Sequence, residues 1–366
     1  MDNLVAADAV EKRQASRLSA LDGLRGVAAL AVLQYHAHDL YGFKLSSSYL
    51  AVDFFFLLSG LVISQAYDRR LETGLSPQRF IAMRLVRLYP LYLLGTLLGA
   101  LFVLANFMLG KASLEGFGAT LFFSLLFIPT PQNTLPGNLD IFPFLYPAWS
   151  LFFELVVNIL YALLFPILRV PVLLAIMAGG AVLVLWSAYQ FGSLNSGFNW
   201  SNFSGGFGRV AFSFFLGVLI QRWRFKWPGG SALALCSAVL LFAILAIDVP
   251  AAMRPVYDVA VTILVFPVIA TVAATCDPGP RLRNLFLFLG GLSYAVYALH
   301  APLLWWTMGA VPMRCRWPTS KNSAIAMPCH KGSNHRDHRI VASHGISPAK
   351  TEYFSDFRYD FIHSPH

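Results

Sequence analysis

Residues 88–110 read LYPLYLLGTLLGALFVLANFMLG and contain no charged side chain. A helix needs about 20 consecutive apolar residues to cross the hydrocarbon core of a bilayer, and this stretch is long enough. Its leucines, alanines and phenylalanines do not alternate with polar residues, so a helix is favoured over a strand of a membrane barrel. The stretch therefore predicts a membrane-spanning helix.

Similar apolar runs recur along the 366 residues. Helices are expected at 22–41, 49–66, 85–109, 148–168, 170–190, 207–222, 231–247, 256–275 and 287–310. Charged residues make up only 12% of the chain, whereas a soluble domain carries about 25%. Because so many long runs could not all be buried in a soluble core, we expect an all-α, polytopic transmembrane helix bundle of about nine to ten helices, surrounded by membrane lipids.

Basic residues lie between the apolar runs rather than in one stripe, so the net charge of +9 does not indicate nucleic acid. The clusters are Lys12/Arg13/Arg17, Arg69/Arg70/Arg79/Arg84/Arg87, Arg222/Arg224/Lys226 and Arg281/Arg283. Such clusters usually face the cytoplasm. All four do so if the short apolar segment 117–129 does not cross, which leaves Lys111, Arg209 and Arg254 outside. We expect nine spans plus a re-entrant or interfacial segment at 117–129.

Three regions are distinguished: a cytoplasmic segment 1–17, a transmembrane domain 18–311 and a polar tail 312–366. The tail has no apolar run and holds six of the nine histidines. Two interpretations of it are open, a disordered tail and a natural end replaced through a reading-frame shift. The four cysteines form no CxxC pair, so neither a metal site nor a disulfide framework is predicted.

Arg25 and His36 are the first candidates for chemistry, because charges at membrane depth are costly and usually functional. They are eleven residues apart in one predicted helix, about three turns and roughly 16 Å along its axis, on nearly the same face. An arginine can hold a phosphate, and a neutral histidine can take a proton from a hydroxyl. A snorkelling arginine and a hydrogen-bonded core histidine are the alternatives, but the shared face favours function.

Three acidic residues are candidates for a catalytic role. Asp53 opens the second predicted helix and could orient the imidazole, as the third member of a triad does. Asp39 could do the same or lie in water at a helix end. Glu154 lies inside a predicted span, where a glutamate is neutral or paired. It is assigned to catalysis, with an arginine's structural partner as the alternative.

Arg84 and Arg87 precede a long predicted helix and are expected at the same membrane face as Arg25, either as a second part of an anion clamp or as positive-inside anchors. Tyr297 and His300 are neighbours three residues apart on the last predicted span and are candidates for acceptor contact or for a structural role. Ser59 and Gly60 are interpreted as a site of close helix packing. The common nucleotide-driven transporters and hydrolases are excluded, because no P-loop, GxSxG, HExxH or Rossmann pattern occurs in a suitable context.

Five stretches, in this order, resemble the membrane-bound acyltransferase-3 family over residues 18–310. They are Leu21-Asp22-Gly23-Leu24-Arg25-Gly26 with His36, Val52-Asp53-Phe54-Phe55-Phe56-Leu57-Leu58-Ser59-Gly60, Arg84-Leu85-Val86-Arg87-Leu88-Tyr89-Pro90, Trp149-Ser150-Leu151-Phe152-Phe153-Glu154 and Leu292-Ser293-Tyr294-Ala295-Val296-Tyr297-Ala298-Leu299-His300. Each stretch is weak alone, but the five together are specific.

The resemblance implies a multi-pass bacterial inner-membrane enzyme. Such enzymes move an acyl group, usually acetyl, from acyl-CoA to a hydroxyl of a carbohydrate or glycolipid acceptor, such as a surface polysaccharide or a Nod factor. Acyl-CoA is the donor substrate, and no bound cofactor is expected. The family's motif residues map onto Arg25, His36, Arg84, Arg87 and Glu154. We expect the three arginines to bind the CoA phosphates while His36, oriented by Asp53, deprotonates the acceptor.

This sequence departs from the family at its end. Family members usually carry one more span after the segment of His300, and 312–366 provides none. An inactive, truncated family member is therefore one alternative. A membrane transporter or permease, with buried charges lining a substrate path, is another, although no inverted repeat is evident.

Overall fold

The computed structural model describes residues 2–223 and 229–310. Within those ranges the chain is helical, with two isolated backbone bridges and no strand. The long helices are α1 (Asp2–His36), α3 (Ala51–Glu72), α4 (Pro77–Met108), α6 (Ala148–Leu164), α7 (Val170–Gln190), α8 (Phe203–Trp223), α9 (Ser231–Ala246) and α12 (Gly279–Ala310). α10 (Arg254–Ala260), a π-helical turn (Val261–Val265) and α11 (Phe266–Ala273) follow one another without a break. The all-α prediction is confirmed, and the tail 312–366 lies outside the described residues.

In the described part of the chain, seven helices are long and apolar enough to cross a membrane. They are Ser48–Glu72, Pro77–Met108, Ala148–Ile167, Val170–Gln190, Phe203–Trp223, Arg254–Ala273 and Gly279–Gly309. The predicted count of nine to ten is not confirmed. α9 has only 16 residues, and α1 carries Asp22, Arg25 and His36 within its apolar stretch. α1 also ends at His36, and a separate short helix, α2 (His38–Tyr41), follows it.

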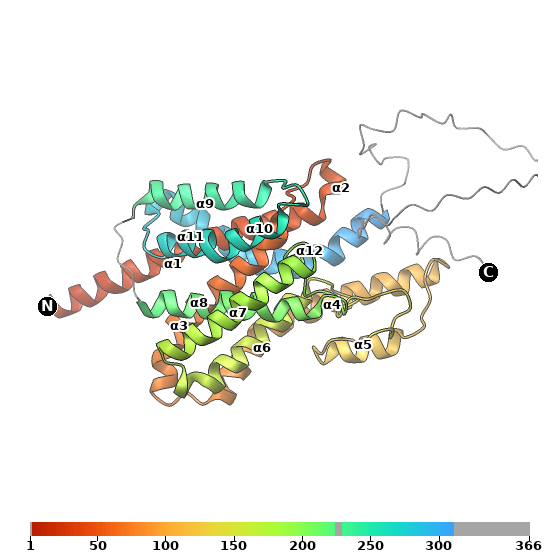
Figure 1. Ribbon diagram of the computed structural model, residues 1–366, viewed down its shortest axis with the longest axis horizontal. Coiled ribbons are helices and arrows are strands. Elements are labelled where there is room, and N and C mark those ends of the chain that lie inside the picture. Colours follow the sequence, from red (N-terminus) through yellow and green to blue (C-terminus); the bar gives the residue numbers. More distant parts are fainter. Residues whose placement is uncertain (1, 224–228, 311–366) are drawn as a thin grey trace, which may run out of the picture.

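The helices pack as two groups. α1 lies against α12 and α9, whereas α3 lies against α8, which in turn contacts α7 and α6. Figure 1 shows α9, α10 and α11 along one side of the bundle and α6, α7 and α8 along the other. α4 contacts both α12 and α6. Residues that are far apart in the sequence therefore face one another along the line where the two groups meet.

Glycines allow two of these helix pairs to approach closely. A Cβ at Gly26 would lie 2.4 Å from the Cβ of Leu289. Only a glycine at this position of α1 therefore lets α12 approach so closely. A Cβ at Gly60 would lie 1.9 Å from the carbonyl oxygen of Phe214 on α8. Small residues at membrane helix interfaces let backbones approach in this way. The predicted role of Gly60 in helix packing is confirmed.

The segment predicted at 117–129 forms α5 (Phe117–Leu125). Nine residues extend about 14 Å as a helix, less than half the thickness of a bilayer core, so α5 does not cross. It packs beside α4 (Figure 1). The hydroxyl of Tyr92 donates a hydrogen bond to the carbonyl of Ser124, 2.5 Å away.

Two loops meet at the end of the bundle where α1 ends. The first joins α5 to α6 and the second joins α7 to α8. The backbone N–H of Ile141 donates to Phe198, and that of Trp200 donates to Leu139, each at 3.1 Å. The indole N–H of Trp200 also donates to the carbonyl of Thr130 at 2.8 Å. The second loop is thus held against the first.

We expect Gly60→Leu to destabilise the fold by about 3 kcal/mol or more, because the added side chain would push α8 away from α3. Gly179→Leu is the matched control, since no atom lies within 4 Å of a Cβ built at Gly179 on α7. The melting temperature of detergent-purified protein, read by size-exclusion chromatography after heating, measures both. Equal melting temperatures for the two variants would contradict the packing role.

Asp140 lies in the loop between α5 and α6, and burial raises the pKa of its carboxyl to about 7. The folded state therefore holds a proton that the unfolded chain releases near pH 4, so stability falls as the pH rises from about 4 to 7. We expect Asp140→Asn to raise the melting temperature at pH 8 and to raise it less at pH 5. Asp248→Asn, at a side chain 81% exposed, controls for the loss of one negative charge. A pH-independent difference between Asp140→Asn and the wild type would argue against this prediction.

Candidate functional site

A pocket lined by three arginines lies between α1, α3, α4, α6 and α12, with about 740 Å³ of empty space. Its polar lining residues are Arg25, Ser59, Arg84, Arg87, Ser150, Glu154, Ser293, Tyr294 and Tyr297. We call it the arginine pocket. It brings together all three arginines that the sequence predicted to act as an anion clamp. It also holds Glu154, which the sequence analysis had assigned to catalysis with His36.

The charges of the arginine pocket do not balance. Arg84 Nη2 lies 3.3 Å from Glu154 Oε1, which also accepts a hydrogen bond from the Ser59 hydroxyl at 2.8 Å. Arg25 Nη1 lies 2.9 Å from Asp22 Oδ1. Among the described residues Arg87 forms no ion pair. Three guanidinium groups thus face two carboxylates, and the excess positive charge suits an anionic group such as a phosphate.

A second pocket lies at the end of α1, with about 510 Å³ of empty space. We call it the histidine pocket. Its lining residues are Val32, Tyr35, His36, Ser48, Tyr49, Val52, Tyr146, Pro147, Trp149, Asn195, Phe198 and Tyr297. The imidazole of His36 contacts the ring of Tyr146 edge-on, with centroids 4.9 Å apart. The ring of Tyr35 also lies edge-on to it at 4.9 Å, and His300 on α12 stacks on it at 5.1 Å with an angle of 24° between the planes.

The backbone of α12 sets the tautomer of His300. Nδ1 of this 2% exposed residue lies 2.8 Å from the carbonyl oxygen of Tyr297. A carbonyl only accepts, so Nδ1 carries the hydrogen and Nε2 has the free lone pair. This Nε2 is buried and has no partner among the described residues. The two candidate histidines therefore lie together, and at least one basic nitrogen is available there.

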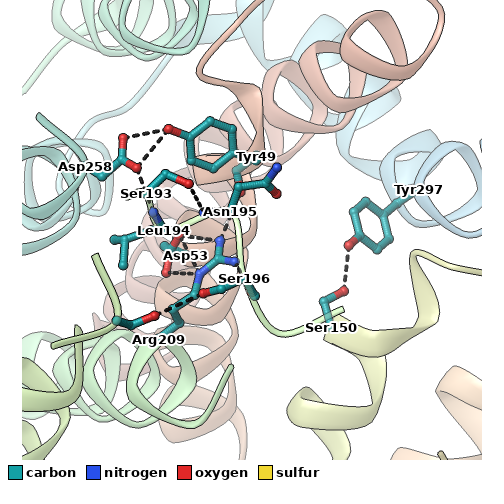
Figure 2. Close-up of polar contacts among 11 residues, drawn as sticks. Tyr49, Asp53, Ser150, Ser193, Leu194, Asn195, Ser196, Arg209, Asp258 and Tyr297 are labelled. Atoms are coloured by element: carbon teal, nitrogen blue, oxygen red, sulfur yellow. Dashed lines mark hydrogen bonds and ion pairs between the residues drawn. The ribbon is translucent and has the colours of Figure 1, made fainter. Parts of the chain in front are cut away.

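The structure does not pair Asp53 with His36 as the sequence analysis expected. Both carboxylate oxygens of Asp53 are engaged by Arg209 of α8, with Nε 3.0 Å from Oδ1 and Nη2 2.6 Å from Oδ2 (Figure 2). Neither side chain is exposed to solvent. Arg209 was expected at the outer side of the membrane as an isolated charge. The available signal was one arginine within the otherwise uncharged segment 203–221, but nothing nearby in the sequence indicated its partner.

The arginine that holds Asp53 also holds the backbone around the histidine pocket. Arg209 Nη1 donates to the carbonyl of Ser196 at 2.7 Å, and Nη2 donates to the carbonyl of Tyr49 at 3.0 Å. The Tyr49 hydroxyl donates to both oxygens of Asp258 on α10, at 2.7 and 2.8 Å. Figure 2 shows these contacts as one connected group that begins in α3 and ends in the loop between α7 and α8.

Tyr297 lines both pockets, and so does Val52. The hydroxyl oxygens of Tyr297 and Ser150 are 2.5 Å apart, and both residues are buried (Figure 2). The pair lies where the arginine pocket and the histidine pocket adjoin. Each of the predicted site residues except Asp53, His300 and the alternative candidate Asp39 therefore lines at least one of two neighbouring pockets, and His300 stacks on His36 in the second. Within the described ranges, no group of three His, Cys, Asp or Glu side chains could hold a metal ion.

Comparison with known proteins shows which family this sequence matches. Residues 18–324 match the acyltransferase domain family, type 3. "Protein 2 in picA locus" of Rhizobium radiobacter is 40% identical over 187 residues, which is 48% of this chain and 96% of that protein. No solved structure matches the chain.

Two further relatives match over longer stretches. The "Putative membrane-bound transacylase BcsY" of Komagataeibacter xylinus is 28% identical over 296 residues, covering 77% of this chain and 72% of the relative. The "Exopolysaccharide production protein ExoZ" of Rhizobium meliloti (strain 1021) is 29% identical over 282 residues, covering 73% and 80%. With the family match spanning most of its length and its helices suited to a membrane, this chain belongs to the acyltransferase-3 family and is a membrane-bound acyltransferase.

Proposed function

We propose that this enzyme moves an acyl group, in the simplest case acetyl, from acyl-CoA to a hydroxyl of a carbohydrate or glycolipid acceptor. We further propose that it does so as a multi-pass protein of a bacterial inner membrane. The observation that carries the proposal is the meeting of the arginine pocket and the histidine pocket at Tyr297. An anionic donor and a neutral hydroxyl need different surroundings, and the two pockets provide them side by side.

The donor is assigned to the arginine pocket. CoA carries phosphate groups, and arginine binds phosphate through charge-assisted hydrogen bonds. Arg25 and Arg84 already have carboxylate partners, so Arg87 contributes the unbalanced charge. Arg25 and His36 are eleven residues apart in α1, roughly 16 Å along its axis. The pantetheine arm of CoA extends from its phosphates and would carry the thioester from one pocket toward the other.

The chemical step is assigned to the histidine pocket. The acceptor oxygen attacks the thioester carbonyl, a C–O bond forms and the C–S bond breaks. His36 takes the proton of the acceptor hydroxyl as general base, and CoA leaves as the thiolate, which this proton neutralises. His300 stacks on His36 and positions its ring. Glu154 is bound to Arg84 and Ser59, so we assign it to shaping the donor pocket.

The transporter alternative has no support in the comparisons, because the chain belongs to an acyltransferase family. The relative named for exopolysaccharide production supports a carbohydrate acceptor. The alternative of an inactive family member depends on the tail, which lies outside the described residues. A measured rate of acyl transfer decides between an inactive family member and the proposed enzyme.

We expect His36→Ala to lower the rate of acyl transfer at least 100-fold, the range typical of a lost general base. His38→Ala is the matched control, because this neighbouring histidine lies on α2 with 39% of its side chain exposed. Transfer of labelled acetyl from acetyl-CoA in membranes measures both variants at equal protein amounts. A folded His36→Ala protein with the wild-type rate would refute this role.

We expect Arg87→Ala to raise the KM for acetyl-CoA at least tenfold, since one charge-assisted hydrogen bond contributes about 1.5–3 kcal/mol. The effect should diminish as salt is added. Arg79→Ala removes an exposed arginine two turns earlier on the same helix and should leave the KM near the wild-type value. If both variants raise the KM equally, the effect arises from general surface charge and not from the arginine pocket.

A further inference from the structure

The loop between α7 and α8 contains a three-residue segment, Leu194–Asn195–Ser196, that reaches the histidine pocket. Asn195 lines this pocket together with His36. Tyr35 lines the same pocket, and Figure 2 shows the side chain of Asn195 directed away from Asp53 and Arg209. We propose that Asn195 binds the acceptor and selects for a polyhydroxylated one. This inference rests on the proposed function and extends it to a residue outside the five family stretches.

The first observation in support concerns Ser196, the residue after Asn195, whose backbone is held by hydrogen bonding. The Ser196 carbonyl accepts a hydrogen bond from Arg209 at 2.7 Å, and the same guanidinium is held by both oxygens of Asp53. Burying a charged pair carries a large desolvation cost. The cost is offset only when the geometry is good and the donors find acceptors, and here each of the three guanidinium nitrogens has at least one acceptor. The carbonyl of Ser196 is thereby held in one place.

The second observation in support concerns Leu194, the residue before Asn195, whose backbone is also held by hydrogen bonding. The N–H of Leu194 donates to Asp258 Oδ2 at 2.8 Å, and the Tyr49 hydroxyl donates to the same carboxylate. Asp258 is fully buried. The N–H of Asn195 itself donates to the Ser193 hydroxyl at 3.2 Å. Helices α8 and α10 thus each fix one neighbour of Asn195, and the side chain between them is presented in a defined direction.

The chemistry of the pocket indicates the ligand. A primary amide offers both a donor and an acceptor, so one asparagine can bind two adjacent hydroxyls. Tyr35 adds a further hydroxyl, and Tyr146 and Phe198 add ring faces. Among the residues that the structure describes, His36 is the only acidic or basic side chain of the Asp, Glu, His, Lys and Arg types that lines the pocket. These groups suit an uncharged ring that carries several hydroxyls, with one of them directed at His36.

The test measures how the acyl group divides between acceptor and water. Membranes of a source strain lacking this gene receive wild type, Asn195→Ala, Asn195→Leu or Ser201→Ala, together with radiolabelled acetyl-CoA. Label in acylated envelope material and label released as free acetate are counted separately. Ser201 lies in the same loop but outside the pocket, and its hydroxyl contacts only Asn199 among the described residues.

We expect the ratio of acetate to acylated product to rise at least tenfold in Asn195→Ala, because an acceptor that binds poorly loses to water. Asn195→Leu keeps the number and branching of the side-chain heavy atoms, and it should show the same rise if the alanine variant does not fold. Ser201→Ala should match the wild type. A wild-type ratio in a folded Asn195 variant, including a parallel loss of both products, would overturn the role of Asn195. Failure of the wild type to form either product would instead overturn the proposed function.

Discussion

The histidine pocket depends on the ion pair between Arg209 and Asp53. Both groups are fully buried, so each is tolerable in an apolar bundle only because the other is present. The pair joins α8 to α3, and the remaining donors of Arg209 hold the backbone carbonyls of Tyr49 and Ser196. Removing either partner would leave an uncompensated charge and would release two walls of the pocket together. The pair therefore connects the stability of the bundle to the shape of its site.

Close helix packing gives the ion pair its fixed distance. α3 and α8 approach at Gly60, where a side chain would collide with the backbone of Phe214. α1 and α12 approach similarly at Gly26, which aligns His36 with His300 and Arg25 with the arginine pocket. Because backbones in contact leave little room for adjustment, the two pockets keep their relation to Tyr297. The proposed donor and acceptor sites therefore lie on opposite sides of one tyrosine.

Much of the fold follows from local patterns, and the predicted helices agree with α3, α4, α6, α7, α8, α9 and α12 to within a few residues at most ends. The number of spans was less predictable, because a span is identified by its length and its mean hydropathy. The polar residues of α1 lower the mean hydropathy, and α9 is short. The three arginines of the arginine pocket were predicted to lie together, because all of them were expected at the same face of the membrane. The partner of Asp53 was not predicted, since Arg209 is 156 residues away in the chain and no periodicity relates the two.

The sequence by itself determined that this is a helical membrane protein of the acyltransferase-3 family, and it identified Arg25, His36, Arg84 and Arg87 as its candidate machinery. Those conclusions depend on composition, on run length and on motifs, all of which are properties of contiguous residues. Only the tertiary structure decided that Glu154 pairs with Arg84, that Asp53 pairs with Arg209, and that Asn195 reaches the pocket of His36. Such pairings depend on which helix faces are brought together across the bundle, and a linear sequence carries no distance between its helices.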